Sequence, residues 1–392
     1  MTAPPPKTPI TVEVFGKTDV GLVREHNEDN FLVADVTGAV RTANPSDPFT
    51  FPLGDKGALF LVCDGMGGAA AGEVASQMAV DSIYDALAAA TAQPRDGFAR
   101  LVRRAVQQAN ERIFIQSRDN QSERGMGTTC TVAGLVDDTL VVAQIGDSRC
   151  YVLRDGKLAQ VTKDQSLAWQ LIEAGAMTAD EAKAFEHANI ILQALGVQER
   201  VEVVLSQVSL RKGDVALLCS DGLHGPVTDE EILAVLIAEP NLQKAGEGLI
   251  QKALDRDGPD NITVALARFE GATLLPPAPE DLVSFIGYDP GNDPVPEATG
   301  TNEDSGLGRE TVEERLPRDL VMPDDVPTKT DSGEPSATRA KAAAPSPSAP
   351  RTARSLLALF LVALIFAAAG GIFVMKCERD QSERSDTRVT LP

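Results

Sequence analysis

Apolar residues follow two alternating patterns along the chain, short continuous runs and longer segments with helical spacing. Short apolar runs bounded by turn residues predict strands, and apolar positions that recur every three or four residues predict amphipathic helices. Two of the runs flank Asp155-Gly156, which predicts a hairpin. The predicted strands are Ala58–Cys63, Thr128–Val136, Leu140–Ile145, Cys150–Leu153, Leu158–Val161, Val201–Val208, Val215–Cys219 and Ile262–Phe269, and the predicted helices are Glu73–Ala90, Asp96–Arg118, Ser166–Ala174, Asp229–Glu239 and Leu242–Leu254.

The order of these elements predicts a fold class. The strands cluster in the middle of the chain and the helices come in pairs, whereas a parallel sheet would need strands and helices in regular alternation. We therefore expect one α+β domain with mainly antiparallel sheets over residues 10–270.

The pattern changes on both sides of this domain. Residues 1–9 are rich in proline and have no apolar core, which predicts a flexible N-terminus rather than a secretion signal. Residues 271–354 hold 13 of the 25 prolines, with 15 acidic and 8 basic residues and few aromatic ones. This composition predicts a disordered linker.

Residues 355–375 predict a transmembrane helix. The 20 residues Leu356–Met375 carry no charge, and a helix of that length spans about 30 Å, the thickness of a bilayer core. Basic residues flank both ends, so they do not fix the orientation. The lack of a secretion signal favours a single-pass membrane protein whose large N-terminal domain is cytoplasmic, with residues 376–392 as a short extracytoplasmic tail.

Net charge and cysteine content exclude several classes of protein. The chain has 36 Lys and Arg against 57 Asp and Glu, a formal charge of −21, which argues against a nucleic-acid partner. The five cysteines show no CxxC pair, which argues against a disulfide scaffold or a zinc site and favours a reducing compartment. Cys63 and Cys219 lie on predicted buried strands, so packing explains them.

Carboxylates at the ends of the predicted apolar strands carry the strongest chemical signal. One Asp-Gly pair is commonly a plain turn, but several such carboxylates would meet at one sheet edge and repel each other unless a cation lay among them. No His or Cys accompanies them, and hard oxygen ligands suit Mg²⁺ or Mn²⁺, with room for two ions that share a carboxylate. These residues are Asp64, Asp147, Asp221 and Asp260.

A further charged segment, Arg24-Glu25-His26-Asn27-Glu28-Asp29, lies near the start of the domain. A guanidinium beside a metal cluster suits a phosphate dianion, because its fork binds two oxygens at once. Spacing alone leaves open the alternative of an exposed charge run with local ion pairs.

Six short stretches together resemble the metal-dependent protein phosphatase family, also called PP2C, in its bacterial serine/threonine form. Their order and spacing match over about residues 10–270. The resemblance implies a four-layer α-β-β-α sandwich of two mainly antiparallel sheets flanked by helix pairs, with metals at one edge. The stretches are Arg24-Glu-His-Asn-Glu28-Asp29, Leu61-Val-Cys-Asp64-Gly65-Met66-Gly67-Gly68, Gly125-Met-Gly127-Thr128-Thr129, Ile145-Gly146-Asp147-Ser148-Arg149, Ser220-Asp221-Gly222-Leu223 and Asp260-Asn261-Ile262-Thr263.

The resemblance also implies two metal ions, Mn²⁺ or Mg²⁺. Asp64 would bridge both ions, and the Gly65 carbonyl would bind one of them. Asp221 and Asp260 would complete the coordination of the second ion.

The remaining roles that the resemblance implies concern water, substrate and a third ion. Glu28 and Asp29 would act mainly through metal-bound waters, and Arg24 would hold the substrate phosphate. Asp147 would hold a third, weaker ion together with Asp221. A hydroxide between the two main ions would attack phosphorus in line, with no phospho-enzyme.

The chain departs from the family pattern at a few positions. Met66 stands where some relatives have His, which leaves the general acid open. Thr162–Gly196 resembles the mobile flap of bacterial members, but Gln165 and Gln193 replace a His and an Arg that are common there. Residues Arg41–Gly57 form an insertion to which the sequence assigns no role.

The leading hypothesis is therefore a membrane-tethered phosphatase that removes phosphate from Ser and Thr of proteins, such as Ser/Thr kinases and their substrates. A catalytically dead binding module would have lost metal ligands, yet Asp64, Asp221 and Asp260 are all present. A regulatory phosphoprotein of sigma-factor control is an alternative substrate that the sequence hardly separates from the first.

Overall fold

Two antiparallel sheets form the centre of the computed structural model, which describes residues 9–42, 48–67, 71–178, 181–182, 185, 187 and 190–291. The first sheet has the order β10 (Lys157–Gln160), β9 (Arg149–Arg154), β12 (Val215–Cys219), β13 (Ile262–Glu270), β1 (Thr11–Asp19) and β4 (Phe49–Pro52). The second has the order β11 (Val204–Ser209), β8 (Thr139–Ile145), β7 (Cys130–Val136), β5 (Ala58–Met66), β2 (Asp29–Asp35) and β3 (Val40–Thr42), and β6 (Gly127–Thr128) pairs with the end of β5.

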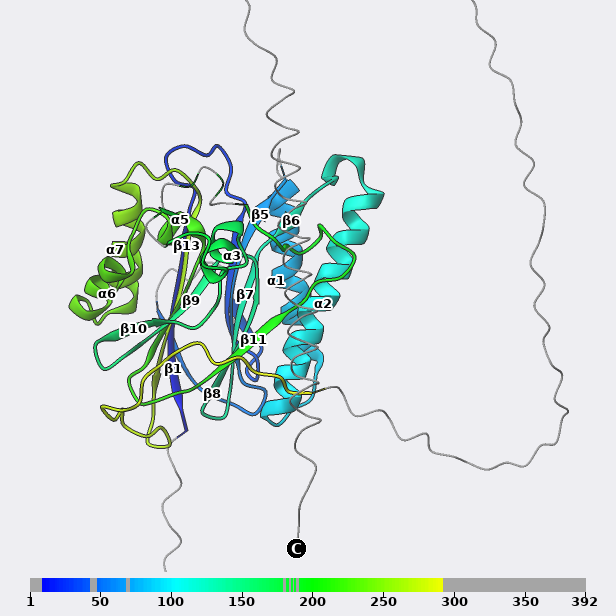
Figure 1. Cartoon of the computed structure of the whole chain (residues 1–392). Coiled ribbons are helices and arrows are strands. Elements are labelled where there is room, and N and C mark those ends of the chain that lie inside the picture. The colour runs from blue at the N-terminus through cyan, green and yellow to red at the C-terminus, as the bar shows by residue number, and fades with distance from the viewer. Residues whose placement is uncertain are drawn as a thin grey trace, which may run out of the picture. The chain divides into compact units, whose positions relative to one another are not determined.

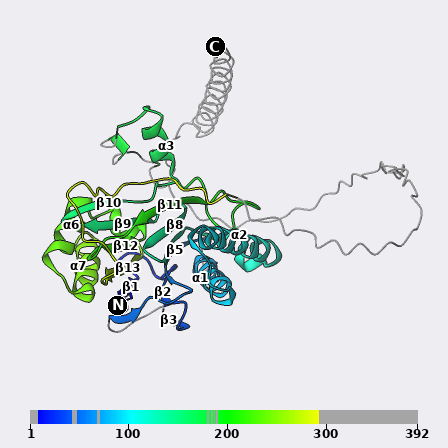
Figure 2. The same ribbon diagram turned by 90° about the horizontal axis from the view of Figure 1, so that it is seen from below.

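Helix pairs cover the outer faces of both sheets, as Figures 1 and 2 show. The two sheets and the helices confirm the predicted fold class in its antiparallel α+β form. Shorter helices lie in the connections. The outer pairs are α1 (Ala71–Ala89) with α2 (Arg95–Asp119) and α6 (Asp229–Ala238) with α7 (Leu242–Leu254), and the shorter helices are η1 (Gln121–Glu123), α3 (Leu167–Glu173) and α5 (Asp221–His224).

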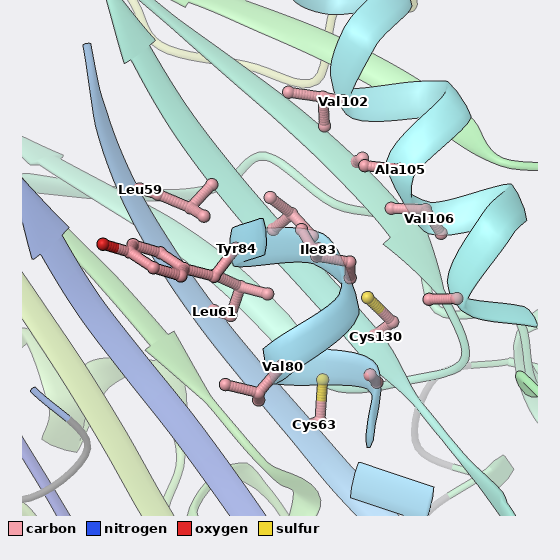
Figure 3. Packing of buried hydrophobic residues seen from close by; sticks show 14 of the residues in the cluster. Leu59, Leu61, Cys63, Val80, Ile83, Tyr84, Val102, Ala105, Val106 and Cys130 are labelled. Carbon is pink, nitrogen blue, oxygen red and sulfur yellow. The ribbon is translucent and has the colours of Figure 1, made fainter. Parts of the chain in front are cut away.

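Strand β5 shows why the central strands are apolar throughout. Its alternate residues point to opposite faces of the sheet, and Leu59 and Leu61 pack against α1 and α2 while Phe60 and Val62 pack into the layer between the sheets. Figure 3 shows the first of these layers, with Cys63 and Cys130 among its apolar side chains. Every cysteine in the described part of the chain is buried and free, as a packing role requires.

The insertion Arg41–Gly57 links the edges of the two sheets. Strand β3 pairs with β2 in the second sheet, and β4 pairs with β1 in the first. The chain then returns to the second sheet as β5. These residues of the insertion therefore extend the edges of the sandwich.

Residues 271–291, which we call the C-terminal strap, lie against the edge of the second sheet. Leu274 is buried, the Tyr288 amide donates to the Leu205 carbonyl at 2.9 Å, and Arg211 forms an ion pair with Asp281. The predicted disordered linker from residue 271 is therefore wrong for its first part. The strap contains apolar and aromatic residues that lie along an edge strand. The average composition of residues 271–354 does not reveal this local feature.

Several predictions fall outside the described residues. These are the linker beyond residue 291, the transmembrane helix 355–375, the tail 376–392 and the first eight residues. Among the helices that the structure does describe, none combines the length and the hydrophobicity needed to cross a bilayer.

Candidate metal centre

The ends of five strands bring the predicted carboxylates to one edge of the sandwich, the upper edge in Figure 1. Asp29 opens β2 and stands opposite Asp64 near the end of β5. Asp221 follows β12, whose end pairs with the start of β13, and Asp260 lies just before β13. Asp147 follows β8, the neighbour of β7. The juxtaposition expected from the sequence is therefore present.

Asp64 is half-buried, and three hydrogen bonds hold its backbone. The Thr129 amide donates to the Asp64 carbonyl at 2.8 Å, the Thr128 hydroxyl donates to the same oxygen at 2.9 Å, and the Asp64 amide donates to Thr129 Oγ1 at 2.9 Å. Loss of hydration, followed by the charges of Asp29 and Asp221, raises the pKa of Asp64 well above its usual range. A cation would relieve this repulsion.

Asp29 joins the two sheets. Its Oδ2 accepts hydrogen bonds from Ser220 Oγ at 2.7 Å and from Thr263 Oγ1 at 2.6 Å. Thr263 lies in β13 of the first sheet, and Ser220 directly follows β12 of the same sheet. Burial nonetheless raises the pKa of Asp29 to about 7. One carboxylate oxygen is thus fixed by hydroxyl groups, while the other remains available.

Asp147 is buried beside His224. The His224 Nε2 lies 3.1 Å from the Asp147 carbonyl oxygen, and burial holds the pKa of His224 well below its usual range. Burial, followed by the charge of Asp221, raises the pKa of Asp147 to about 7. Burial, followed by the charge of Asp260, also raises the pKa of Asp221.

Unpartnered oxygens show whether this site suits a metal ion. Buried polar atoms are almost always hydrogen-bonded, and the described residues contain five buried side-chain atoms that are not. Three of these are Oδ1 of Asp29, Asp147 and Asp221. Unpaired carboxylate oxygens are hard ligands, which fit Mg²⁺ or Mn²⁺.

The carboxylates do not yet enclose an ion. Among the described residues, no three acidic, His or Cys side chains are arranged so that they could hold one metal. A bound cation would compensate the unpaired carboxylate oxygens that this cluster buries. Metal binding therefore requires these side chains to rearrange.

Glu28 and Gly65 lie where the start of α1 approaches β5. The Gly65 amide donates to the Glu28 carbonyl at 3.2 Å. A Cβ on Gly65 would lie 2.3 Å from the Gly72 carbonyl oxygen, and a Cβ on Gly72 would lie 2.8 Å from Glu28 Cδ. Only glycine permits this approach, which keeps Glu28 beside the backbone of Gly65.

Arg24 is paired with a carboxylate that is distant in the sequence. Its Nη2 lies 2.6 Å from Oδ2 of Asp260, and this hydrogen bond raises the pKa of Arg24. The structure thus places Arg24 at the cluster, in contrast to the alternative of an exposed charge run with local ion pairs.

Asn261 positions the loop that carries Arg24, a role that sequence reasoning missed. Its Nδ2 donates to the carbonyls of Val20 at 2.9 Å and His26 at 3.0 Å. Its Oδ1 accepts from the Glu28 amide at 2.8 Å. The signal was its place beside Asp260 in the Asp-Asn-Ile-Thr stretch.

The two glutamines of the flap region have structural partners. The backbone amide of Gln165 donates to the Gly146 carbonyl at 2.9 Å. The Gly146 backbone amide donates in turn to Gln165 Oε1 at 2.9 Å. Gln193 Oε1 accepts from the Glu202 amide at 2.9 Å. Gln165 therefore fixes the turn that carries Asp147.

Known proteins resemble this chain in sequence and fold. The family described as protein phosphatase 2C matches residues 40–255. A protein named serine/threonine phosphatase stp, from Listeria monocytogenes serovar 1/2a, is 36% identical over 251 residues, which are 64% of this chain and 93% of that protein. The serine/threonine protein phosphatase PstP of Mycobacterium tuberculosis is 36% identical over 258 residues, 66% of this chain and 45% of PstP.

A solved structure of a related protein contains metal ions. The crystal structure of the catalytic domain of PstP in complex with two manganese ions is 35% identical, covers 67% of this chain and 99% of that one, and superposes with a TM-score of 0.55. The chain is thus similar in sequence and fold to a protein that binds two manganese ions.

Proposed function

Because the chain belongs to the protein phosphatase 2C family and is a protein serine/threonine phosphatase, we propose that its carboxylate edge hydrolyses phosphoserine and phosphothreonine with two divalent ions, Mn²⁺ or Mg²⁺. The observation that carries this proposal is the set of unpaired carboxylate oxygens on Asp29, Asp147 and Asp221 beside Arg24. Bound cations relieve the repulsion among these groups and let them stay ionised.

The chain supplies distinct ligands to these ions. Asp64 would bind both ions, the Gly65 carbonyl would contribute to one, and Asp221 and Asp260 would bind the other. When bound, the ions supply an activated water and neutralise charge on the phosphate. The hydrogen bonds that Thr128 and Thr129 make with the Asp64 backbone keep the bridging position fixed.

Other residues act around this pair. Glu28 and the free Oδ1 of Asp29 would orient water at the ions, and Asp147 with Asp221 would hold a third, weaker ion. The buried, unpartnered Oδ1 atoms of Asp147 and Asp221 support this assignment.

Arg24 binds the substrate phosphate. Its guanidinium is half-exposed and reaches the cluster, so a phosphate dianion replaces Asp260 as its partner once that carboxylate turns to a metal. The fork geometry of guanidinium suits two phosphate oxygens. Met66 has no acidic proton to give, so the leaving oxygen receives its proton from water.

We also propose where the enzyme acts. The uncharged stretch Leu356–Met375 supports a single membrane span that keeps the catalytic domain in the cytoplasm, close to membrane-bound Ser/Thr kinases and their substrates. Cell fractionation tests this proposal. The full chain is expected in the membrane fraction, and a chain lacking 355–375 outside it.

The activity itself is tested with the purified full-length chain and peptides that carry phosphoserine, phosphothreonine or phosphotyrosine. We expect Mn²⁺-dependent hydrolysis of the first two, and its loss with a chelator or with Asp64→Asn. Asp55→Asn, an exposed carboxylate outside the site, is the matched control. Hydrolysis that persists in the chelator or in Asp64→Asn would refute the metal mechanism.

A further inference from the structure

The loop between β1 and β2, residues 20–28, presents two adjacent apolar side chains to solvent beside Arg24. Leu22 is 67% exposed and Val23 is 66% exposed. Single exposed apolar residues are normal on a protein surface. Two neighbours beside the phosphate-binding arginine are different, because such patches mark contact sites when they adjoin a functional group. We call Leu22 and Val23 the apolar ridge.

The backbone of the ridge is fixed to the segment that carries Asp260. The Leu22 amide donates to the Gly258 carbonyl at 2.8 Å. Gly21 has φ of +76°, and a Cβ there would lie 2.2 Å from the Asp260 carbonyl oxygen. The loop thus packs directly on this segment, so the ridge keeps its position relative to Arg24 and the carboxylates.

The position of the ridge determines which residues of a bound substrate can contact it. Consecutive Cα atoms are about 3.8 Å apart, so the ridge begins one residue from Arg24. An extended substrate advances about 3.3 Å per residue. When Arg24 holds the phosphate, the substrate residues one or two positions from the phosphorylated side chain are therefore within reach of the ridge.

We propose that Leu22 and Val23 form a docking surface for an apolar side chain of the substrate protein, one or two residues from the phosphoserine or phosphothreonine. This inference rests on the proposed function, since it needs the phosphate on Arg24. Its basis is that the ridge is continuous with the phosphate site. Contact would bury apolar surface on both partners and favour such substrates by about tenfold in kcat/KM.

The test uses the full-length chain with Mn²⁺ and a set of phosphothreonine peptides. Each peptide carries one leucine, at a single position between three residues before and three residues after the phosphothreonine, in an otherwise Ser/Gly sequence. We expect the native chain to prefer leucine at a position within two residues by about tenfold over the peptide without leucine. The double substitution Leu22→Asn with Val23→Thr, which nearly preserves side-chain volume, should abolish this preference.

Two controls separate docking from catalysis and folding. Ile237→Asn changes an apolar residue that is 55% exposed on α6 and should keep the peptide preference. The double substitution should weaken peptide turnover at least fivefold more than turnover of p-nitrophenyl phosphate, which has no flanking residues.

The outcomes decide between the proposals. Equal rates on all peptides in the native chain, with Mn²⁺-dependent hydrolysis intact, would overturn the docking surface and leave the proposed function standing. No Mn²⁺-dependent hydrolysis of any substrate would overturn both. Loss of a dimer in the double variant, with an unchanged peptide preference, would assign the ridge to self-association and overturn the proposal.

Discussion

Strand β12 carries an aspartate at each end, and the two differ in their partners. Asp214, just before the strand, is buried and accepts hydrogen bonds from Arg154 Nε at 3.0 Å, from Arg154 Nη2 at 2.6 Å and from the Arg211 amide at 2.8 Å. Asp221, just after the strand, has a buried Oδ1 with no partner.

The contrast distinguishes a carboxylate that stabilises the fold from one that binds a ligand. A buried carboxylate with a complete set of donors costs little in the folded state, whereas one without them destabilises it. Evolution retains the second kind where function needs it. We therefore interpret Asp214 as a structural residue and Asp221 as a residue that binds a cation.

The largest effect that this comparison predicts is on activity. Asp221→Asn removes a metal ligand and should lower kcat/KM on phosphothreonine peptides by more than about 100-fold. The same change removes an unpaired charge, so the metal-free variant should unfold at a higher temperature than the native chain. Steady-state kinetics with Mn²⁺ and thermal unfolding in a chelator measure the two effects. A variant that keeps native activity would show that Asp221 is no ligand.

Asp214→Asn should show the opposite pair of effects. Arg154 is only 7% exposed, and without its carboxylate it becomes a buried unpaired cation, which costs about 3–5 kcal/mol in the free energy of unfolding. The activity of the folded fraction should stay within about twofold. Urea unfolding provides the measurement. Asp281→Asn is the control, because its partner Arg211 is more exposed and the expected loss is much smaller. Equal losses in both variants would contradict the comparison.

The C-terminal strap sharpens the same distinction, because its backbone bonds to Leu205 and Lys212 involve none of the carboxylates of the candidate metal centre. A chain that ends at residue 270 lacks the bonds from Lys212 to Leu275 and from Tyr288 to Leu205, together with the buried Leu274. Each backbone bond contributes about 1 kcal/mol, so we expect a loss of roughly 2–3 kcal/mol relative to a chain that ends at 291. Urea unfolding of the two chains, with Mn²⁺ absent, measures this difference, and identical midpoints would show that the strap is dispensable.

The sequence predicts the regular elements best where packing makes the pattern uniform. Helix α7 has the predicted bounds, since its apolar stripe and its Asn241 cap agree. Strand β5 is apolar on both faces and was equally clear. Strands β1 and β2 were missed because they mix buried and partly exposed positions, and the short edge strands β3 and β4 carry little signal of any kind.

The site was predictable in its carboxylates but not in their supports. Asp64 and Asp221 stand out because each ends an apolar strand. The bonds from Ser220 and Thr263 to Asp29 join residues about 200 positions apart, and no local pattern encodes such a pairing. The pairing of Arg24 with Asp260 is of the same kind.

The smallest effect expected is a pH dependence of stability in the metal-free protein. Burial raises the pKa of Asp29 and Asp147 to about 7, from about 4 in the unfolded chain. Between these values the folded state binds more protons than the unfolded state, so the free energy of unfolding falls as pH rises through 7. The loss between pH 6 and pH 8 is about 1 kcal/mol for each group.

Thermal unfolding in a chelator at pH 6, 7 and 8 measures this slope, and the same series with saturating Mn²⁺ tests its origin. Bound ions favour the ionised carboxylates, so the midpoint should no longer fall as pH rises. Asp29→Asn should reduce the slope in the chelator by about half, because Asp147 still titrates, whereas Asp214→Asn should leave it intact, because Asp214 already has its donors. The same slope in chelator and in Mn²⁺ would mean that Asp29 and Asp147 do not face the ions. The proposal that Asp221, unlike Asp214, lies in a metal-binding cluster would then lose its support.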